Sequence, residues 1–453
     1  MRKIIQYMMM ALIAVVLASC ANDISEESTP TVKSNIRFVV DDFPMFEKPS
    51  TRTIGEEDKG KTAWAVGDEI CVKLESKELG TQTATLKYNG VKFELQDGNS
   101  LGYLEDEPVT AYAYYAPNRK WLNDGNLGYK DGEHNGTAEF LEATCTVHYG
   151  DNNYVDISFA NATRNYSRLR IATIPKTEIN VDAKDFSPTD NHNRLYMTYT
   201  LTSDEKGNAY LYGTFYNNSI VTVKYRGATL KTYKFSKETE NAKSYVLDAT
   251  VISANSAKEI YSAIKQEVAN SKTAIRLNLA SDAGDNEFNA IREAFENVRG
   301  YGTIDLTLIG CKEIPVNGLY RIMALKSITL PDVTKIRMDA LSSCLYLQEI
   351  CAPNVSAIDE YAFGKCRYLR KVTLGKLTDV RGEANSRSGI FDDINDLYPD
   401  IDLYLPKNQE VMEFDENSKQ YIWKPTGENY FAIPDSDNGI FLGYQFKSVK
   451  SWE

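Results

Sequence analysis

The side chains that most often carry catalysis are few in this sequence. Its 453 residues include three histidines, His134, His148 and His192, and none stands at the spacing of a metal-binding or nucleophilic motif. The segment SAIK (262–265) matches the pattern SxxK, but it lies in an amphipathic stretch and its usual partner motifs are missing. We therefore expect a protein that is not an enzyme and that holds no cofactor and no metal.

Carboxylates gather in one place where a cation could bind. They are Asp392, Asp393, Asp396, Asp400 and Asp402. Carboxylate oxygens are the ligands that Ca²⁺ prefers, yet a solvated loop is the favoured interpretation of this segment. The stretch DSDNG (435–439) lacks the further carboxylates of an EF-hand, so a turn is favoured there.

Cys20 has the most informative context of the seven cysteines. An apolar run from Met8 to Ala18 follows two basic residues and ends in LASC (17–20). The run is too short for a membrane span, which needs about 20 residues, and has the length of a signal-peptide core. This segment resembles the lipobox of bacterial lipoproteins. The resemblance implies a signal peptide over 1–19, lipidation of Cys20 and attachment to the membrane through the N-terminal lipid.

The overall charge argues against one class of partner. The formal net charge is −12 at neutral pH, so we expect no binding to nucleic acid. Residues 20–34 are polar and acidic, which predicts a flexible tether. The carboxylates behind Cys20 resemble the acidic export signals of surface-displayed lipoproteins in Bacteroidetes-type bacteria.

The first half of the chain reads as β-structure. Short stretches in which apolar and polar residues alternate occur from residue 35 to about residue 250. They are rich in Tyr, Thr and Val and are bounded by Gly, Asn, Asp or Pro. This spacing predicts two β-sandwiches in series, over 35–150 and 151–251.

Three segments of this half resemble the fimbrillin-like surface lipoproteins of Bacteroidetes-type bacteria. They are TRTIGEEDKGKTAWAVGDEICV (51–72), AYAYYAP (111–117) and GATLKTYKFSKETENAKSYVLDATV (227–251). The resemblance implies transthyretin-like sandwiches. It also implies a place for proteolytic processing at Arg52, after which such proteins assemble into fimbriae by strand exchange. The alternative, that Arg52 belongs to an ordinary polar loop, is preferred.

After residue 251 the pattern becomes mixed α/β. Apolar residues at helical spacing occur over 253–272 and 285–300, with the strand-like IRLNL (275–279) between them. We expect these helices to cap the N-terminal end of a solenoid over 252–406. The aromatic tail over 407–453 is expected to cap the other end.

A repeat of 22 residues is the strongest pattern in the chain. The segments 325–344 and 347–366 align without a gap, and aliphatic residues recur 22 positions apart at four places. This period predicts a leucine-rich repeat solenoid. AIDEYAFGKCRYLRKVTL (357–374) resembles the BspA-like subclass of these repeats.

Each rung of such a solenoid has one strand with alternating side chains. The aliphatic positions 306, 328, 350, 372 and 403 must point inward, so the residues beside them form two outward ladders. One ladder is Asp305, Ser327, Glu349, Lys371 and Asp402; the other is Thr307, Thr329, Cys351, Thr373 and Tyr404. These ladders are the candidate binding face, and an ordinary solvated surface is the alternative.

Cys344 and Cys366 occupy equivalent positions on adjacent rungs. Their spacing leaves a disulfide open, although packing of two small apolar side chains is preferred.

Together these patterns predict a lipid-anchored protein of the outer membrane, exposed at the cell surface. We expect it to act in adhesion or recognition, toward a host protein, a glycan or another bacterial surface. A minor or tip pilin and an accessory binding lipoprotein of a nutrient-uptake system are the alternatives.

Overall fold

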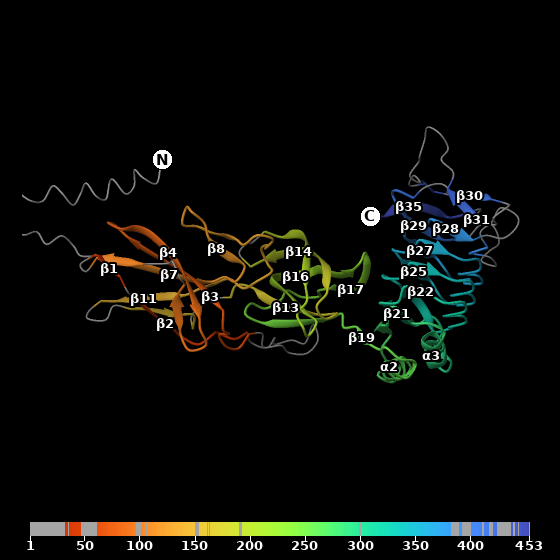
Figure 1. Cartoon of the computed structure of the whole chain (residues 1–453), viewed down its shortest axis with the longest axis horizontal. Coiled ribbons are helices and arrows are strands. Elements are labelled where there is room, and N and C mark those ends of the chain that lie inside the picture. The colour runs from red at the N-terminus through yellow and green to blue at the C-terminus, as the bar shows by residue number, and fades with distance from the viewer. Residues whose placement is uncertain are drawn as a thin grey trace, which may run out of the picture.

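The chain folds into two β domains followed by a repeat solenoid, arranged along the long axis of the molecule (Figure 1). The computed structural model describes residues 32–34, 36–46, 61–96, 101–104, 107–149, 154–160, 162, 164–189, 193–298, 300–381, 389–391, 400–409, 412–415, 420–423, 436–437, 440–442 and 444–452. In these ranges no helix combines the length and the apolar character that crossing a bilayer requires.

The first domain packs a five-stranded sheet against a three-stranded one. The larger sheet has the order β10-β7-β3-β4-β5 and the smaller the order β11-β12-β2. The strands are β2 (Arg37–Val40), β3 (Glu69–Ser76), β4 (Gly80–Tyr88), β5 (Phe93–Leu95), β7 (Thr110–Tyr115), β10 (Leu141–Glu142), β11 (Thr144–His148) and β12 (Tyr154–Ser158). Two short pairs accompany them, β1 (Val32–Ser34) with β6 (Gly102–Leu104) and β8 (Arg119–Trp121) with β9 (Leu127–Tyr129). Alternate residues such as Ile70, Leu86 and Ile157 are buried between the sheets, as a strand with one wet face requires.

The boundary between the β domains differs from the one that the sequence predicts. Strand β12, expected to begin the second sandwich, pairs in parallel with β2 and antiparallel with β11, both in the first domain. Asp41 fixes this pairing, because its carboxylate accepts hydrogen bonds from Phe159 N at 2.9 Å and from Ser158 Oγ at 2.6 Å. The first domain therefore extends to about residue 160.

The second domain is one curled sheet rather than two separate sheets. Its strands are β13 (Ser167–Ala172), β14 (Glu178–Pro188), β15 (Leu195–Thr202), β16 (Asn208–Tyr225), β17 (Ala228–Lys234) and β18 (Ser244–Asp248). Strand β16 is 18 residues long and pairs with β13, β14 and β17 along its length. All six strands contribute to one buried cluster that includes Val181, Leu211 and Leu247. The inward side chains of this open sheet thus form a sandwich-like core.

The solenoid is built from two mainly parallel sheets that face each other across an aliphatic core. The nine-stranded sheet contains β19 (Ile252–Ser253), β20 (Ala274–Asn278), β21 (Ile304–Ile309), β23 (Leu325–Thr329), β25 (Glu349–Ala352), β27 (Lys371–Leu374), β29 (Asp402–Pro406), β35 (Ser448–Trp452) and β32 (Ser436–Asp437), in that order. The six-stranded sheet contains β22 (Glu313–Ile314), β24 (Lys335–Ile336), β26 (Ala357–Ile358), β28 (Asp379–Arg381), β31 (Gln420–Trp423) and β30 (Met412–Asp415). A short hairpin of β33 (Ile440–Phe441) and β34 (Tyr444–Gln445) follows near the C-terminus.

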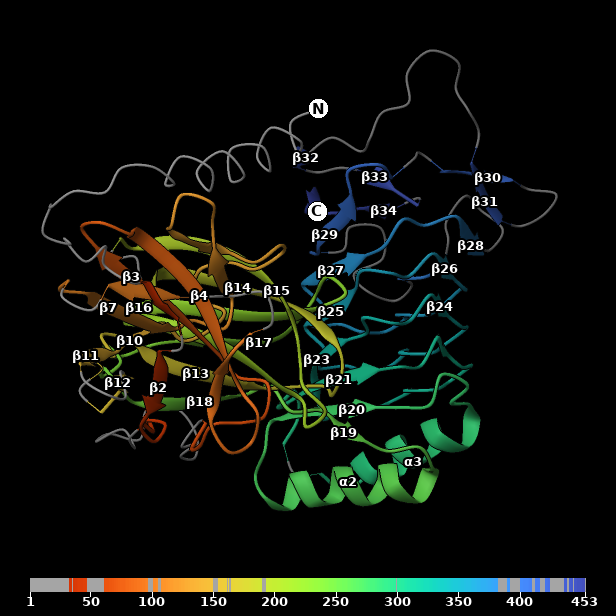
Figure 2. The same ribbon diagram turned by 60° about the vertical axis from the view of Figure 1, so that its left-hand side comes forward.

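Two helices cover the N-terminal end of the solenoid (Figure 2). They are α2 (Ala257–Ala269) and α3 (Asp285–Phe295). Ser256 caps α2 by accepting a hydrogen bond from Glu259 N, and Ile260 and Ile264 on the inner face are fully buried. At the other end, β35 adds a strand beside β29, so the terminal rung does not expose its core.

Candidate functional site

The two predicted ladders coincide with register pairs of the nine-stranded sheet. Asp305, Ser327, Glu349, Lys371 and Asp402 pair from strand to strand, and Thr307, Thr329, Cys351, Thr373 and Tyr404 do the same. The side chains between them, such as Ile328 and Ile350, are fully buried. The spacing of parallel strands, about 4.8 Å, therefore sets the spacing of side chains along each ladder.

The structure lengthens both ladders beyond the predicted residues. Ala274 lies beside Asp305 and Arg276 beside Thr307 at the first rung, while Ser448 and Lys450 follow Asp402 and Tyr404 at the last rung. Alternation in IRLNL and SVKSW would have revealed these positions, since Ile275, Leu277 and Val449 point inward. We call the ten predicted residues and these four additions the ladder face.

The charged side chains of the first ladder form hydrogen bonds with neighbouring side chains of the ladder face. Lys371 Nζ donates to Glu349 Oε1 at 2.5 Å. Burial would lower the pKa of Lys371, but this bond and the charge of Glu349, with smaller contributions from Cys351 and Tyr404, together outweigh it and raise that pKa. Ser327 Oγ donates to Asp305 Oδ1 at 2.6 Å. A bond from Ser448 Oγ, at 2.5 Å, leads the causes that hold the pKa of Asp402 below its usual range, with Lys450 and Lys447 adding to it. The side chains of Glu349 and Lys371 remain 42% and 46% exposed, so solvent and a partner can reach them.

The second ladder is less accessible. Thr307 is buried, with 7% of its surface exposed, which differs from the wet position that the sequence predicts for it. Burial raises the pKa of the Cys351 thiol to about 11, so this cysteine is a neutral thiol at physiological pH. Tyr404 lies between two ammonium groups, with Lys371 Nζ at 5.6 Å and Lys450 Nζ at 5.8 Å from its ring centroid.

A hairpin of the second domain contacts the solenoid beside the ladder strands. The turn between β16 and β17 reaches the solenoid, and both views place β17 beside the ladder strands (Figures 1 and 2). At its tip, Arg226 forms an ion pair with Asp332, and Asn354 Nδ2 donates to Arg226 O at 3.2 Å. Asp332 and Asn354 are 22 residues apart, in the turns that follow β23 and β25.

The same hairpin reaches both ends of the ladder face. Arg276 Nε donates to Leu230 O at 2.9 Å on the first rung. Trp452 of the last rung lies near Gly227, and its Nε1 donates to Leu374 O at 2.8 Å. Gly227 has φ +82°, a conformation that glycine adopts without strain. The second domain thus covers the C-terminal ends of the ladder strands and leaves the first ladder partly exposed.

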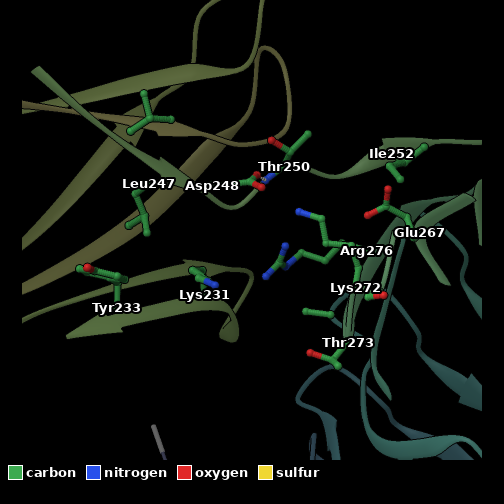
Figure 3. A pocket seen from close by; sticks show the side chains of 13 residues that line it. Lys231, Tyr233, Leu247, Asp248, Thr250, Ile252, Glu267, Lys272, Thr273 and Arg276 are labelled. Atoms are coloured by element: carbon green, nitrogen blue, oxygen red, sulfur yellow. Dashed lines mark hydrogen bonds between the residues drawn. The ribbon is translucent and has the colours of Figure 1, made fainter. Parts of the chain in front are cut away.

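A cleft of about 620 Å³ lies where the hairpin meets the first rung (Figure 3). It is lined by charged side chains of three elements, Lys231 from β17, Asp248 from β18 and Arg276 from β20, and by Glu267 and Lys272 of the N-terminal cap. Burial would raise the pKa of Asp248, but hydrogen bonds from Thr250 and the charges of Arg276 and Lys272 outweigh it and lower that pKa.

The equivalent cysteines of adjacent rungs are free thiols. Cys344 Sγ donates to Leu319 O at 3.1 Å, and Cys366 Sγ donates to Leu341 O at 3.2 Å. Both side chains are fully buried, and burial raises the pKa of Cys344 to about 12. Each thiol thus bonds to a carbonyl of the preceding rung instead of to the other sulfur.

Several other predicted residues lie outside the described ranges. These are Cys20, Arg52, His192 and the aspartates 392, 393 and 396. His148 stacks on Tyr154, and its Nε2 lies 2.9 Å from Asp156 Oδ2. Across the described part of the chain, His, Cys, Asp and Glu do not gather in threes that could hold a metal.

Comparison with known proteins identifies the repeats. No curated protein matches the sequence. A solved structure from Bacteroides fragilis NCTC 9343, provisionally described as a cell adhesion protein, aligns with 48% of this chain and 92% of its own, at 10% identity and a TM-score of 0.28. Residues 289–390 match the family of BspA type leucine-rich repeat regions in six copies. The solenoid of this β-rich multidomain protein therefore contains a BspA-type leucine-rich repeat region.

Proposed function

We propose that this protein is a surface-displayed lipoprotein, held in the outer membrane by a lipid on Cys20, and that its solenoid recognises a host protein, a glycan or another cell without catalysis. One observation carries the proposal: adjacent rungs present charged and polar side chains in register on an accessible sheet face. Such a face can meet an extended partner with one contact for each rung.

The arrangement of the domains supports this proposal. The two β domains follow one another along the long axis and lead to the solenoid (Figure 1). We take residues 35–251 as fimbrillin-like domains that hold the solenoid away from the membrane. A lipid on Cys20, followed by the polar segment 20–34, would place the ladder face at a distance from the bilayer.

A charge exchange tests the ladder face. The chain without residues 1–19 is applied to an array of glycans and matrix proteins, beside the double variant Glu349→Lys, Lys371→Glu. This exchange keeps an ion pair but reverses its direction, so we expect the fold to persist. We expect binding to fall about tenfold or more, because one charge-assisted hydrogen bond to the partner would be misplaced.

The matched control exchanges a similar pair on the six-stranded sheet. Arg337 Nε donates to Glu313 Oε1 at 2.6 Å there. The variant Glu313→Arg, Arg337→Glu is expected to bind like the wild type. Equal loss in both variants, or unchanged binding in the first, would show that the ladder face is not the binding surface.

The lipid anchor needs a separate test. Labelled palmitate supplied to expressing cells should enter the wild-type protein and not Cys20→Ala, and the variant should leave the membrane fraction. Protease added to intact cells should digest the anchored wild type. A protein that resists protease until the cells are opened would contradict display at the surface.

A further inference from the structure

The cleft between the second domain and the first rung adjoins the ladder face. Its volume, about 620 Å³, is sufficient for two or three sugar units or a short peptide. Lys231 and Tyr233 from β17 form one wall, and Arg276 with Lys272 forms the opposite wall (Figure 3). Because Ala274 and Arg276 are also positions of the ladder face, the cleft continues that face at its first rung.

Positive charge predominates inside the cleft. Three cations line it, Lys231, Lys272 and Arg276, against two carboxylates, Asp248 and Glu267. Figure 3 shows the side chains of Arg276 and Lys272 extending into the space toward Lys231 and Asp248. Burial lowers the pKa of Arg276, although nearby carboxylates act in the opposite direction. An anion in the cleft would therefore compensate a guanidinium whose environment disfavours its charge.

The remaining lining suits a hydroxyl-rich molecule. Thr250, Ser271 and Thr273 supply hydroxyl groups that both donate and accept hydrogen bonds. The two carboxylates can accept hydrogen bonds from sugar hydroxyls, and the half-buried ring of Tyr233 offers an aromatic surface. Cations, hydroxyls, carboxylates and one aromatic ring together match a sugar that carries an acid group.

We infer that this interdomain cleft binds a carboxylated saccharide, with the sugar carboxylate held by Arg276, Lys231 and Lys272 and the sugar hydroxyls by the threonines, Asp248 and Glu267. The inference rests on the proposed recognition function and gives a ligand class to one end of the ladder face. Arg276 is the central group, because its Nε is anchored on Leu230 O and its position is thereby fixed.

Calorimetric titration of the chain without residues 1–19 tests the inference, with a trisaccharide of galacturonic acid as the probe. The methyl ester of the same trisaccharide and free acetate are the comparison ligands. We expect the acid to bind, the ester at least about tenfold more weakly, and the affinity for the acid to fall with added salt. Equal binding of acid and ester would overturn the role of charge. Equal binding of the trisaccharide and acetate would overturn the saccharide assignment, and absence of binding would overturn both.

Variants place the ligand in the cleft. Lys231→Ala and Lys272→Ala should each weaken binding of the acid about two- to fivefold, as expected of partly solvated charges, and Arg276→Gln about tenfold or more. Lys234→Ala is the matched control, since Lys234 is exposed on the same strand as Lys231 and does not line the cleft. Because Arg276→Gln also removes an interdomain hydrogen bond, the two lysine variants keep the test valid if that variant is unstable.

The cleft and the ladder face can fail independently. Glu349→Lys, Lys371→Glu should leave binding of the trisaccharide unchanged, because these residues do not line the cleft. If that exchange abolishes array binding while the trisaccharide does not bind, the ladder proposal stands and the cleft assignment falls. If the cleft variants lose the trisaccharide while array binding resists the exchange, the reverse holds.

Discussion

The two junctions between domains are built in opposite ways. Where the first β domain meets the second, Arg164 and Glu139 form an ion pair with side chains only 3% and 5% exposed, and Arg164 lies 4.2 Å from the ring centroid of Phe46. Tyr166 and Tyr212 pack their rings beside the same phenylalanine. Where the second domain meets the solenoid, the hairpin tip makes mostly polar contacts and leaves a cleft.

This difference separates a junction with a buried ion pair from one with a half-exposed ion pair. The ion pair at the first junction is buried, so we expect its two domains to behave as a single rigid body. At the second junction Arg226 is 53% exposed although its partner Asp332 is 2% exposed. A ligand can therefore reach the polar groups that line the cleft at the second junction.

The first junction should show the largest mutational effect. Glu139→Ala leaves the buried guanidinium of Arg164 without its carboxylate, and we expect a loss of about 3–5 kcal/mol in the free energy of unfolding. Denaturant unfolding, followed through the β-domain transition, measures it. The control is Asp131→Ala, which removes an exposed ion pair with Lys120 and should change stability by less than about 1 kcal/mol. Similar losses in both variants would remove the distinction between the junctions.

Substitutions at the second junction should lower the free energy of unfolding by less, and mainly at Asp332. Asp332 Oδ2 accepts from Gly310 N at 2.9 Å, so Asp332→Ala leaves that partly buried N–H without this acceptor and should cost about 1–3 kcal/mol. Arg226→Ala removes a half-exposed partner and should cost about 1 kcal/mol or less.

Limited proteolysis of the segment between β18 and α2 reports the opening of this junction. We expect cleavage to be faster in Asp332→Ala than in Arg226→Ala. The opposite order would mean that the arginine, and not the carboxylate network of the repeat turn, holds the hairpin.

The smallest effect should depend on pH. Because the pKa of Asp248 is lowered in the folded protein, its contribution is present above its ordinary value of 3.8 and is lost as the pH falls through the folded value. Asp248→Asn should therefore cost up to about 1 kcal/mol at pH 7, and progressively less as the pH falls below 3.8. Urea unfolding across this range measures the difference, with the exposed Asp282→Asn as control. A difference that grows on acidification would reverse the assigned sign.

The sequence predicts local repetition well and distant pairing poorly. The 22-residue period places Ile328 and Ile350 in one buried column and their neighbours in two ladders, because each rung repeats the same short-range geometry. By contrast, β12 pairs with β2, whose residues lie more than a hundred positions earlier, and alternation is identical for either partner. The boundary near residue 150 could not be placed correctly for this reason.

The candidate site shows the same limit. The ladder residues follow from spacing alone, whereas the cleft needs Lys231 of one domain and Arg276 of another to meet. Nothing in the tip of a Tyr-Arg-Gly-Ala turn indicates that it will dock on Asp332 and Asn354. The burial of Thr307 was equally hidden from the sequence.

The hairpin that joins the two domains also constrains how the protein can evolve. Solenoids commonly gain or lose whole repeats by duplication and deletion, because each rung contacts only its neighbours. Here one short hairpin touches Arg276 at the first rung, Asp332 in the middle and Trp452 at the last. An added rung anywhere between them would shift one contact by about 4.8 Å relative to the others. The hairpin thus constrains the number of repeats, and selection on the junction would preserve the length of the solenoid.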